Sequence, residues 1–424
     1  MQKKPPSMLH WLSCRRCDIV NAMTNEENRI EENKIASDFL QLGISAKISS
    51  ALENCGIKNP TAVQSHVIPL ILAGENVIFK SETGTGKTFA YLLPILERIS
   101  SISSEEKSSS TKAVVLAPTY ELSSQIKSQL QRISAVKSAL LIGGAPIKRQ
   151  IESLKEKPEI IIGSVGRILE LLRLKKIKTD SLKFVVLDEA DRLLDRELRD
   201  ETSALLRLIF AEKADANIVQ IAGCSATAGE KTRLAIAEMT GAKMKLESLP
   251  DEDILRKKIE HWAIFAERRD KIDTLRSLIN AVSAKPPFKM IVFTSRGDQV
   301  ENISRKLLFK KIKCASLYAK MGKMERKSAI DSFRSGKCSV LVTSDLAARG
   351  LDIAGVTHVA QLDFPSDLAA FTHRAGRTGR QGARGVSAVI GDEKEMRDYA
   401  AAEKKLGIIV YPKMLFGGEV VAPK

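Results

Sequence analysis

Residues 76–88 read NVIFKSETGTGKT, and this stretch decides the fold class. An apolar run that is typical of a buried strand leads into a glycine-rich turn and then into a helix. Gly84 and Gly86 allow backbone N–H groups to curl around a phosphate, and the helix amino terminus adds its positive dipole end. Lys87 is expected to reach the β- and γ-phosphates, and Thr88 to ligate Mg²⁺. The stretch therefore predicts an α/β domain that binds a nucleotide.

The same alternation of short apolar runs and helix-length segments continues along the chain. The expected strands of the first half are residues 76–81, 113–118, 159–163, 183–188 and 217–223. Those of the second half are residues 261–266, 289–295, 313–319, 339–344, 357–363 and 385–391. Continuous apolar strands between helices favour mainly parallel sheets that helices cover on both faces. Because the pattern occurs twice, we expect two α/β domains in tandem.

The expected domain boundaries follow from breaks in this pattern. We predict an extension at 1–35, which is disordered or has a targeting role, a first domain at 36–247, a linker at 248–254, a second domain at 255–415 and a tail at 416–424. The apolar part of residues 1–22 is too short for a signal-peptide core, although organelle import stays open. The start at Met1 or at Met23 is likewise left open.

Composition indicates the kind of partner. The 424 residues carry 67 Lys and Arg against 51 Asp and Glu, which gives a formal net charge of +16. Such a balance favours a polyanion, with nucleic acid first and an anionic membrane second. No apolar run approaches the roughly 20 residues of a membrane helix. The six cysteines are few for the length, and the Cys14–Cys17 pair has no second pair at zinc-site spacing, so we expect a reducing compartment, the cytoplasm.

A second motif, VVLDEADRLL at 185–194, ends a buried strand in two carboxylates. Carboxylates at the carboxyl end of a strand suit magnesium and water chemistry. Asp188 would hold Mg²⁺, mostly through water, and Glu189 would orient and deprotonate the attacking water. An acidic helix amino terminus explains the pair without catalysis. The phosphate loop about a hundred residues upstream favours the catalytic interpretation.

Together these motifs resemble the DEAD-box family of ATP-dependent RNA helicases, over about residues 36–410. The resemblance implies two tandem RecA-like domains, ATP and Mg²⁺ as cofactors, and a monomer that binds RNA without sequence preference. It implies an RNA-stimulated ATPase that locally unwinds short duplexes or remodels RNA–protein complexes, with protein cofactors as further partners. An ATP-gated RNA clamp with little turnover and a DNA helicase on the same plan are the alternatives. The physiological RNA cannot be named from the residues.

The resemblance extends to the recognition of the base. GIKNPTAVQ at 56–64 resembles the family's adenine-recognition element, in which the Gln64 amide fits the N6/N7 edge of adenine. Phe39 would stack on the base, although an ordinary core aromatic is the alternative. The implied ATP-binding residues are Phe39, Gln64, Ser81, Glu82, Thr83, Gly84, Thr85, Gly86, Lys87, Thr88 and Asp352. Ser81 stands where the phosphate-loop pattern usually has glycine.

Short motifs in both halves resemble family segments that contact RNA. They are PTYEL, GG, SVGR, FTS and TSDLAARGLD, which begin at residues 118, 143, 164, 293 and 343. The implied RNA contacts are Pro118, Thr119, Gly143, Gly144, Arg167, Thr294, Thr343 and Arg349. The residues implied to couple hydrolysis to duplex opening, or to join the domains, are Asp191, Ser225, Thr227, His373 and Arg374.

FTHRAGRTGR at 371–380 crowds three guanidinium groups, which repel one another unless an anion lies among them. By resemblance Arg377 and Arg380 are arginine fingers for the γ-phosphate of ATP bound to the other domain, and they act with Lys87 and Glu189 in catalysis. A patch for the RNA backbone is the alternative.

The chain also departs from the family pattern. Tyr120 replaces an arginine, Val165 a proline, Lys323 a glutamine, and residues 318–319 a histidine-glycine pair. All of these positions are RNA-facing or interdomain, so the departures bear on RNA coupling more than on ATP binding.

Overall fold

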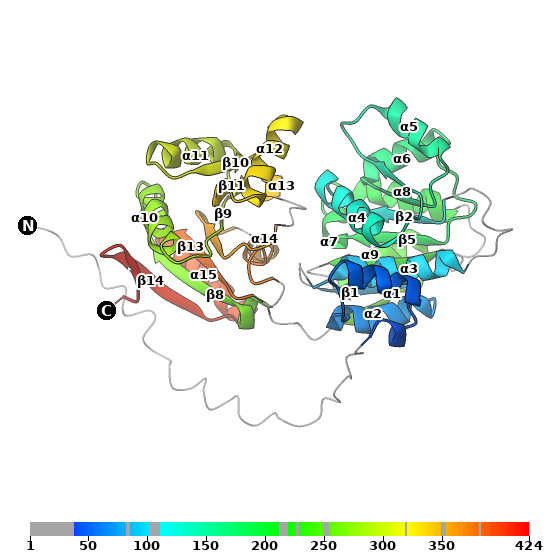
Figure 1. The fold of residues 1–424 in the computed structure, drawn as a ribbon, viewed down its shortest axis with the longest axis horizontal. Helices are drawn as coiled ribbons and strands as arrows, with labels where there is room; N and C mark the ends of the chain where they lie inside the picture. The colour runs from blue at the N-terminus through cyan, green and yellow to red at the C-terminus, as the bar shows by residue number, and fades with distance from the viewer. Residues whose placement is uncertain are drawn as a thin grey trace, which may run out of the picture. The chain divides into compact units, whose positions relative to one another are not determined.

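The computed structural model describes residues 38–81, 85–101, 111–211, 219–225, 229–248, 254–318, 320–348, 353–365, 367–380 and 383–423. Two mainly parallel sheets, each covered by helices on both faces, form two separate α/β domains (Figure 1). The predicted fold class is therefore confirmed. Both Cys14 and Cys17 lie outside the described residues. In the part of the chain that the structure describes, no helix is both long and apolar enough to span a bilayer.

The sheet of the N-terminal domain has seven strands within the described residues, in the order β3-β4-β2-β5-β6-β1-β7. The strands are β1 Val77–Lys80, β2 Ala113–Leu116, β3 Ser138–Leu141, β4 Ile160–Gly163, β5 Phe184–Asp188, β6 Gln220–Ser225 and β7 Lys245–Ser248. Every neighbouring pair is parallel. The helical segments are η2 Leu40–Leu42, α1 Ala46–Asn54, α2 Ala62–Leu72, α3 Lys87–Ser100, α4 Tyr120–Ile133, α5 Ile147–Lys155, α6 Val165–Arg173, α7 Ala190–Leu193, α8 Arg199–Ala211 and α9 Glu230–Thr240.

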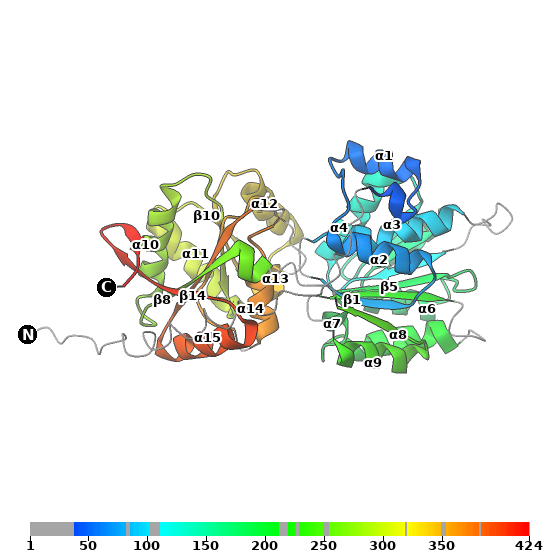
Figure 2. The same cartoon turned by 90° about the horizontal axis from the view of Figure 1, so that it is seen from below.

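The strands of this sheet are continuously apolar because helices cover both of its faces. Helices α1 to α4 cover one face of the sheet, and α6, α8 and α9 cover the other (Figure 2). Phe79 packs into the core beneath the first group, whereas its neighbour Ile78 packs into the core beneath the second. Successive side chains of a strand point to opposite faces, so each strand residue supplies one core or the other. Both residues are fully buried.

The sheet of the C-terminal domain has eight strands among the described residues, in the order β10-β11-β9-β12-β13-β8-β14-β15. The strands are β8 Ile259–Phe265, β9 Met290–Thr294, β10 Cys314–Leu317, β11 Val340–Ser344, β12 His358–Gln361, β13 Gly385–Gly391, β14 Val410–Phe416 and β15 Glu419–Val421. The helical segments are η4 Ile254–Lys258, α10 Lys271–Ser283, η5 Gly297–Gln299, α11 Val300–Phe309, α12 Lys323–Arg334, α13 Asp345–Ala348, α14 Leu368–Ala375 and α15 Glu393–Leu406. Helices α10 and α11 cover one face, and α12 to α15 pack on the other.

The structure adds strands to those expected from the sequence. The additional strands are β3, β7, β14 and β15, and all but β14 lie at a sheet edge. β15 pairs antiparallel with β14, so residues 419–421 belong to the second sheet. Part of the segment predicted as a tail at 416–424 thus pairs with a neighbouring strand, and the expected domain boundaries stay a prediction.

Parallel pairing places the carboxyl ends of neighbouring strands on the same side of the sheet, across the strand direction. In the N-terminal domain β5, β6 and β1 are neighbours, and the phosphate-binding and acidic motifs follow them. Strands β3, β4 and β2 form the other half of the sheet, and the motifs predicted to contact RNA follow them. The strand order thus groups the two sets of motifs next to each other along the row of strand carboxyl ends.

A substitution at Gly163, where the ends of β4 and β3 lie close together, tests the packing of these two strands. A Cβ at this position would lie 1.9 Å from the Leu141 carbonyl oxygen, which is backbone and cannot move aside. Gly163→Ala is expected to lower the free energy of unfolding by about 2 kcal/mol or more, and Tm by about 4–8 °C. Gly143→Ala is the matched control, because no described atom lies within 4 Å of its added Cβ. Equal thermal unfolding of both variants would contradict this account.

Candidate active site and nucleic-acid interface

The motifs predicted to bind ATP meet at the carboxyl ends of three neighbouring strands. Ser81 follows β1, Asp188 ends β5 and Ser225 ends β6. The Ser81 N–H donates to the Ser225 carbonyl oxygen at 2.9 Å. This bond ties the start of the phosphate loop to the strand that carries the predicted coupling segment.

The phosphate loop ends at the amino terminus of α3. Gly86 precedes this helix with φ 92°, a left-handed conformation that favours glycine. Lys87 and Thr88 are the first two residues of the helix, where backbone N–H groups attract phosphate. The hydroxyls of Ser81 and Thr85 hydrogen-bond to each other, so serine fits the first position of the loop. Of the predicted loop residues, Glu82, Thr83 and Gly84 lie outside the described residues.

The Gln64 amide connects the predicted adenine-recognition element to the phosphate loop. Its Oε1 accepts from the Thr61 N–H at 2.9 Å, and its Nε2 donates to the Gly86 carbonyl oxygen at 3.1 Å. A side chain on Gly86 would collide with this amide, since the added Cβ would lie 2.4 Å from Nε2. An amide has two N–H groups and two acceptor lone-pair sites, so these contacts leave capacity to recognise a base.

Phe39 lies in the core of the N-terminal domain. Its side chain is 1% exposed and packs with the apolar residues beneath α1 to α4. A ring that is covered in this way cannot stack on a ligand without moving. The structure therefore favours the core alternative for Phe39, and its stacking on adenine stays a prediction.

Two buried side-chain donors hydrogen-bond to the Asp188 carboxylate, which is itself 3% exposed. The Tyr91 hydroxyl donates to Oδ2 at 2.8 Å, and the Cys224 thiol donates to Oδ1 at 3.1 Å. The backbone N–H of Glu189 also donates to Oδ1, at 2.9 Å. Sequence reasoning missed Tyr91 and Cys224, because an aromatic in an apolar helix and a cysteine in an apolar strand look like ordinary core residues. Burial raises the pKa of both side chains well above their usual values, so both stay protonated.

Glu189 follows Asp188 in a strained backbone conformation. Its φ is 52°, in the left-handed region, which costs a residue other than glycine about 1–3 kcal/mol. Burial raises the pKa of its carboxyl group, whereas the Lys87 ammonium opposes this shift. Asp191, two residues further along the chain, accepts from the Arg192 N–H at 2.9 Å. Strain and a raised pKa at one carboxylate are both typical of a catalytic position.

Contacts order the predicted RNA segments of the N-terminal domain and join two of them. Thr119, which follows Pro118 after β2, caps α4 by accepting from the Leu122 N–H at 3.2 Å. The Gly143 N–H donates to the Ser164 hydroxyl at 3.3 Å, which joins the GG turn, with its Gly144 at φ 73°, to the SVGR segment.

Other residues of these segments support the same surface. Arg167 donates to the Ala145 carbonyl oxygen at 3.0 Å and pairs with Glu170 at 2.9 Å. Val165, which stands where the family usually has proline, is 1% exposed and packs in the hydrophobic core. Tyr120 is 39% exposed and begins α4. Its ring therefore presents an aromatic surface beside the predicted RNA contacts.

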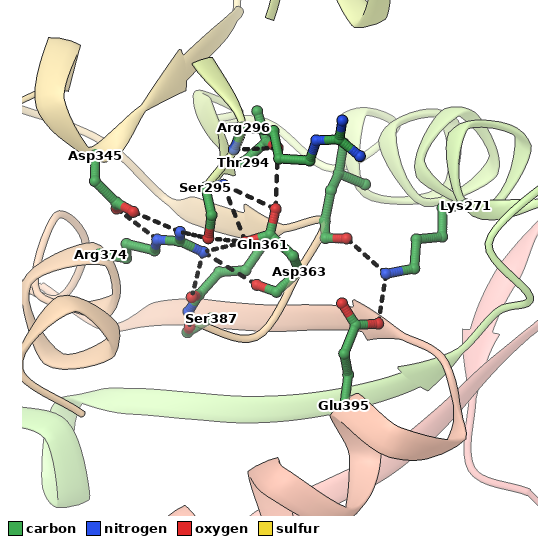
Figure 3. A network of polar contacts seen from close by, with 11 residues as sticks. Lys271, Thr294, Ser295, Arg296, Asp345, Gln361, Asp363, Arg374, Ser387 and Glu395 are labelled. Carbon is green, nitrogen blue, oxygen red and sulfur yellow. Dashed lines mark hydrogen bonds and ion pairs between the residues drawn. The ribbon is translucent and has the colours of Figure 1, made fainter. Parts of the chain in front are cut away.

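In the C-terminal domain Arg374 is the centre of a buried polar network (Figure 3). Its guanidinium group donates to both carboxylate oxygens of Asp345 at 2.6 Å. It also donates to Asp363 Oδ1 at 3.1 Å and to the Ser295 hydroxyl at 2.8 Å. Thr294 joins the same network, because its hydroxyl donates to Asp363 Oδ2 at 2.9 Å.

This network was only partly foreseen, since sequence reasoning assigned Arg374 to interdomain contacts. The contacts above all lie within the C-terminal domain, and an interdomain role of Arg374 stays a prediction. The signal that could have found Asp345 and Asp363 is their position just after β11 and β12, where side chains gather. Burial alone would raise the pKa of Asp363, but Arg374 and the hydroxyls of Ser295 and Thr294 hold it below its usual range.

The remaining predicted residues of this domain lie nearby or outside the described residues. Thr343 is fully buried in β11, and its hydroxyl donates to the Ser344 carbonyl oxygen at 3.2 Å. His373 is on α14, and Arg377 and Arg380 follow that helix. The Arg380 Nε–H donates to the Gly376 carbonyl oxygen at 2.8 Å. Thr227, Arg349, Asp352, Ala319 and the side chain of Lys323 are outside the described part.

Family models match both domains of the chain. The DEAD/DEAH box helicase family matches residues 61–235, and the helicase conserved C-terminal domain matches residues 270–382. Among curated proteins, the DEAD-box ATP-dependent RNA helicase CshC of Bacillus cereus is 37% identical over 382 residues, which are 89% of this chain and 93% of that protein. The ATP-dependent RNA helicase CshA of Listeria monocytogenes is 34% identical over 84% of this chain and 66% of its own length.

Solved structures show the same fold. Dbp5 of S. cerevisiae bound to RNA and ADP BeF3 superposes with a TM-score of 0.76 at 26% identity, covering 90% of this chain and 96% of that one. Mss116p bound to ssRNA and AMP-PNP gives a TM-score of 0.80 at 24% identity, over 92% and 81% of the two chains. The chain belongs to the DEAD-box family of ATP-dependent RNA helicases. It is therefore an enzyme that hydrolyses ATP, and its domains are RecA-like.

Removal of the Arg374 side chain would leave two partly buried carboxylates without their cation. Arg374→Ala is expected to lower the free energy of unfolding of the C-terminal domain by about 3 kcal/mol. Denaturant unfolding measures the loss. Arg397→Ala is the matched control, because its pair with Glu393 is exposed and such pairs contribute little. A loss no larger than that of Arg397→Ala would contradict the structural role of Arg374.

Loss of the Gln64 amide should change nucleotide choice. Gln64→Ala is expected to reduce the preference for adenine over guanine about tenfold or more, because a bidentate amide contact is lost. Competition of ATP and GTP for the enzyme measures it. Thr61→Ala is the control, since it removes the hydroxyl of the helix cap but keeps the Gln64 amide. Unchanged selectivity in Gln64→Ala would exclude a role in base recognition.

Proposed function

We propose that this helicase opens short RNA duplexes locally, or remodels RNA–protein complexes, by coupling ATP hydrolysis to closure of its two domains on RNA. The observation that carries the proposal is the strand order of the N-terminal sheet. It places the ATP motifs after β5, β6 and β1, and the predicted RNA segments after the adjoining β2, β4 and β3. Both ligands would therefore bind along one edge of one rigid sheet.

The residues at this edge fit a magnesium nucleotide. Lys87 would bind the β- and γ-phosphates, and the Thr88 hydroxyl and Asp188 carboxylate would hold Mg²⁺. These are hard oxygen ligands, which Mg²⁺ prefers. The described residues contain no cluster of three or more His, Cys, Asp or Glu that could hold a metal alone. This fits an ion that arrives with the nucleotide, and it would neutralise charge on the phosphates when bound.

Glu189 is the proposed general base. Its carboxylate would orient the attacking water and take its proton. Burial raises the pKa of this carboxyl group, which makes the carboxylate a better proton acceptor than an exposed one. The backbone N–H of the proposed base donates to Asp188 Oδ1 and so helps to orient the proposed metal ligand.

The proposed RNA surface is made of loops and helix amino termini. Backbone N–H groups there bind phosphates of any sequence, which supports recognition without base preference. Dbp5 and Mss116p were solved with RNA, and their folds match this chain. In the C-terminal domain Thr294 is held by the Arg374 network, so we propose that this network keeps the second RNA segment rigid.

Arg377 and Arg380 would complete the ATP site from the C-terminal domain. A site that is divided between two domains makes hydrolysis conditional on closure. RNA that binds both domains would favour closure, and by linkage ATP would tighten RNA binding. The intact Glu189 and Arg377 argue against a clamp with little turnover. The family membership argues against a DNA helicase. The cytoplasmic location stays a prediction.

Arg377 provides the test of this proposal. Arg377→Ala is expected to lower kcat at saturating RNA and ATP by about 10³ or more, because a finger acts when charge develops on the transferred phosphoryl group. ATP affinity should barely change, since Lys87 and Asp188 hold the nucleotide on the N-terminal domain. Steady-state hydrolysis with RNA, with matched DNA and without nucleic acid provides the measurement.

Arg384→Ala is the control, because Arg384 is an exposed arginine only a few residues further along the chain. It should keep kcat near the native value. If Arg377 instead contacts RNA phosphates, Arg377→Ala would weaken RNA binding and flatten its salt dependence, with near-native kcat at saturating RNA. That result would refute the finger role.

A further inference from the structure

Tyr91 lies one turn along α3 from Thr88 and is completely buried. Its hydroxyl donates to Asp188 Oδ2 at 2.8 Å, and the Thr88 hydroxyl opposes the upward shift that burial gives to the pKa of this phenol. Residues three apart on a helix share a face, so α3 itself brings Tyr91 to Thr88. The phenol thus contacts Asp188 and lies on the same face of α3 as Thr88, and these are the two residues that we assign to Mg²⁺.

Cys224 reaches the same carboxylate from the neighbouring strand. It pairs in register with Asp188, as β6 lies beside β5. Its thiol donates to Oδ1 at 3.1 Å, and the side chain is completely buried. The two donors approach different oxygens of Asp188, so together they oppose rotation of the carboxylate about its Cβ–Cγ bond.

We propose that the Tyr91 hydroxyl and the Cys224 thiol are positioning groups that hold the Asp188 carboxylate ready for Mg²⁺ before the nucleotide binds. The inference deepens the proposed function, since it rests on Asp188 as a metal ligand. Groups that hydrogen-bond to metal ligands orient them, and their loss typically reduces metal affinity or activity by about 10- to 100-fold.

Packing alone does not account for these two polar groups. A phenyl ring would fill the Tyr91 site equally well, and alanine or valine would suit the Cys224 strand. A buried hydroxyl costs free energy unless it is hydrogen-bonded, and here its bond goes to the assigned ligand Asp188. Both polar groups therefore lie where they contact Asp188.

The test measures how ATP binding depends on Mg²⁺, with a fluorescent ATP analogue and the full chain. Tyr91→Phe keeps the ring and is expected to raise the Mg²⁺ concentration for half-maximal binding about tenfold. Cys224→Ala is expected to raise it by a smaller factor, because a thiol is a weaker donor, and Cys224→Ser to restore it. Binding in the presence of a chelator should stay unchanged in these variants.

Two reference variants complete the design. Tyr399→Phe removes another buried hydroxyl, which has no hydrogen-bond partner among the described residues, and should leave the Mg²⁺ requirement native. Asp188→Asn is the positive reference and should shift it most. Thermal unfolding shows whether each variant folds. If Tyr91→Phe does not fold, the Mg²⁺ requirements of Cys224→Ala and Cys224→Ser decide whether the inference holds.

A purely structural role would lower Tm without moving the Mg²⁺ requirement. The inference is overturned if the Mg²⁺ concentration for half-maximal binding stays within about twofold of native in both Tyr91→Phe and Cys224→Ala while Asp188→Asn still shifts it. That outcome would leave the proposed function intact. If Asp188→Asn leaves the requirement unchanged, the metal role of Asp188 fails, and the inference fails with it.

Discussion

Parallel strand pairing is the constraint on which the rest of this molecule depends. Parallel strands need a crossover between each pair, and here helices supply these crossovers and cover both faces of the sheet. The parallel strands of each sheet therefore all end on the same side of that sheet, where each passes into a loop or a helix amino terminus. The core takes every apolar side chain of strands such as β1 and β5, and only their ends are left to carry chemistry.

Strand order then decides which loops are neighbours. Strand β1 is first in the chain but lies between β6 and β7, which places the phosphate loop beside Ser225 and one strand away from Asp188. Asp188 in turn gathers contacts from α3, β6 and its own chain neighbour. Segments more than a hundred residues apart in sequence thus act on one carboxylate, and its exact orientation is a property of the tertiary fold.

Residues whose roles are local could be predicted from the sequence, and residues whose roles come from packing could not. The glycine-rich turn predicted the phosphate loop, and the apolar runs predicted most of the central strands. The edge strands β3 and β7 read SALL and KLES, which are too short and too polar to signal a strand. Tyr91 lies among apolar residues of α3, and nothing in that stretch indicates that its hydroxyl reaches Asp188. Likewise, no spacing rule connects Arg374 with Asp345, 29 residues upstream.

The brevity of the edge strands has a consequence for how this protein behaves at high concentration. In the described part of the chain, the sheets end in β3 and β7, and in β10 and β15, which are three or four residues long. A long unpaired edge offers a row of backbone donors and acceptors to a strand of another molecule. These four edges are too short to template an intermolecular sheet, so the folded domains resist amyloid-like association through their own strands.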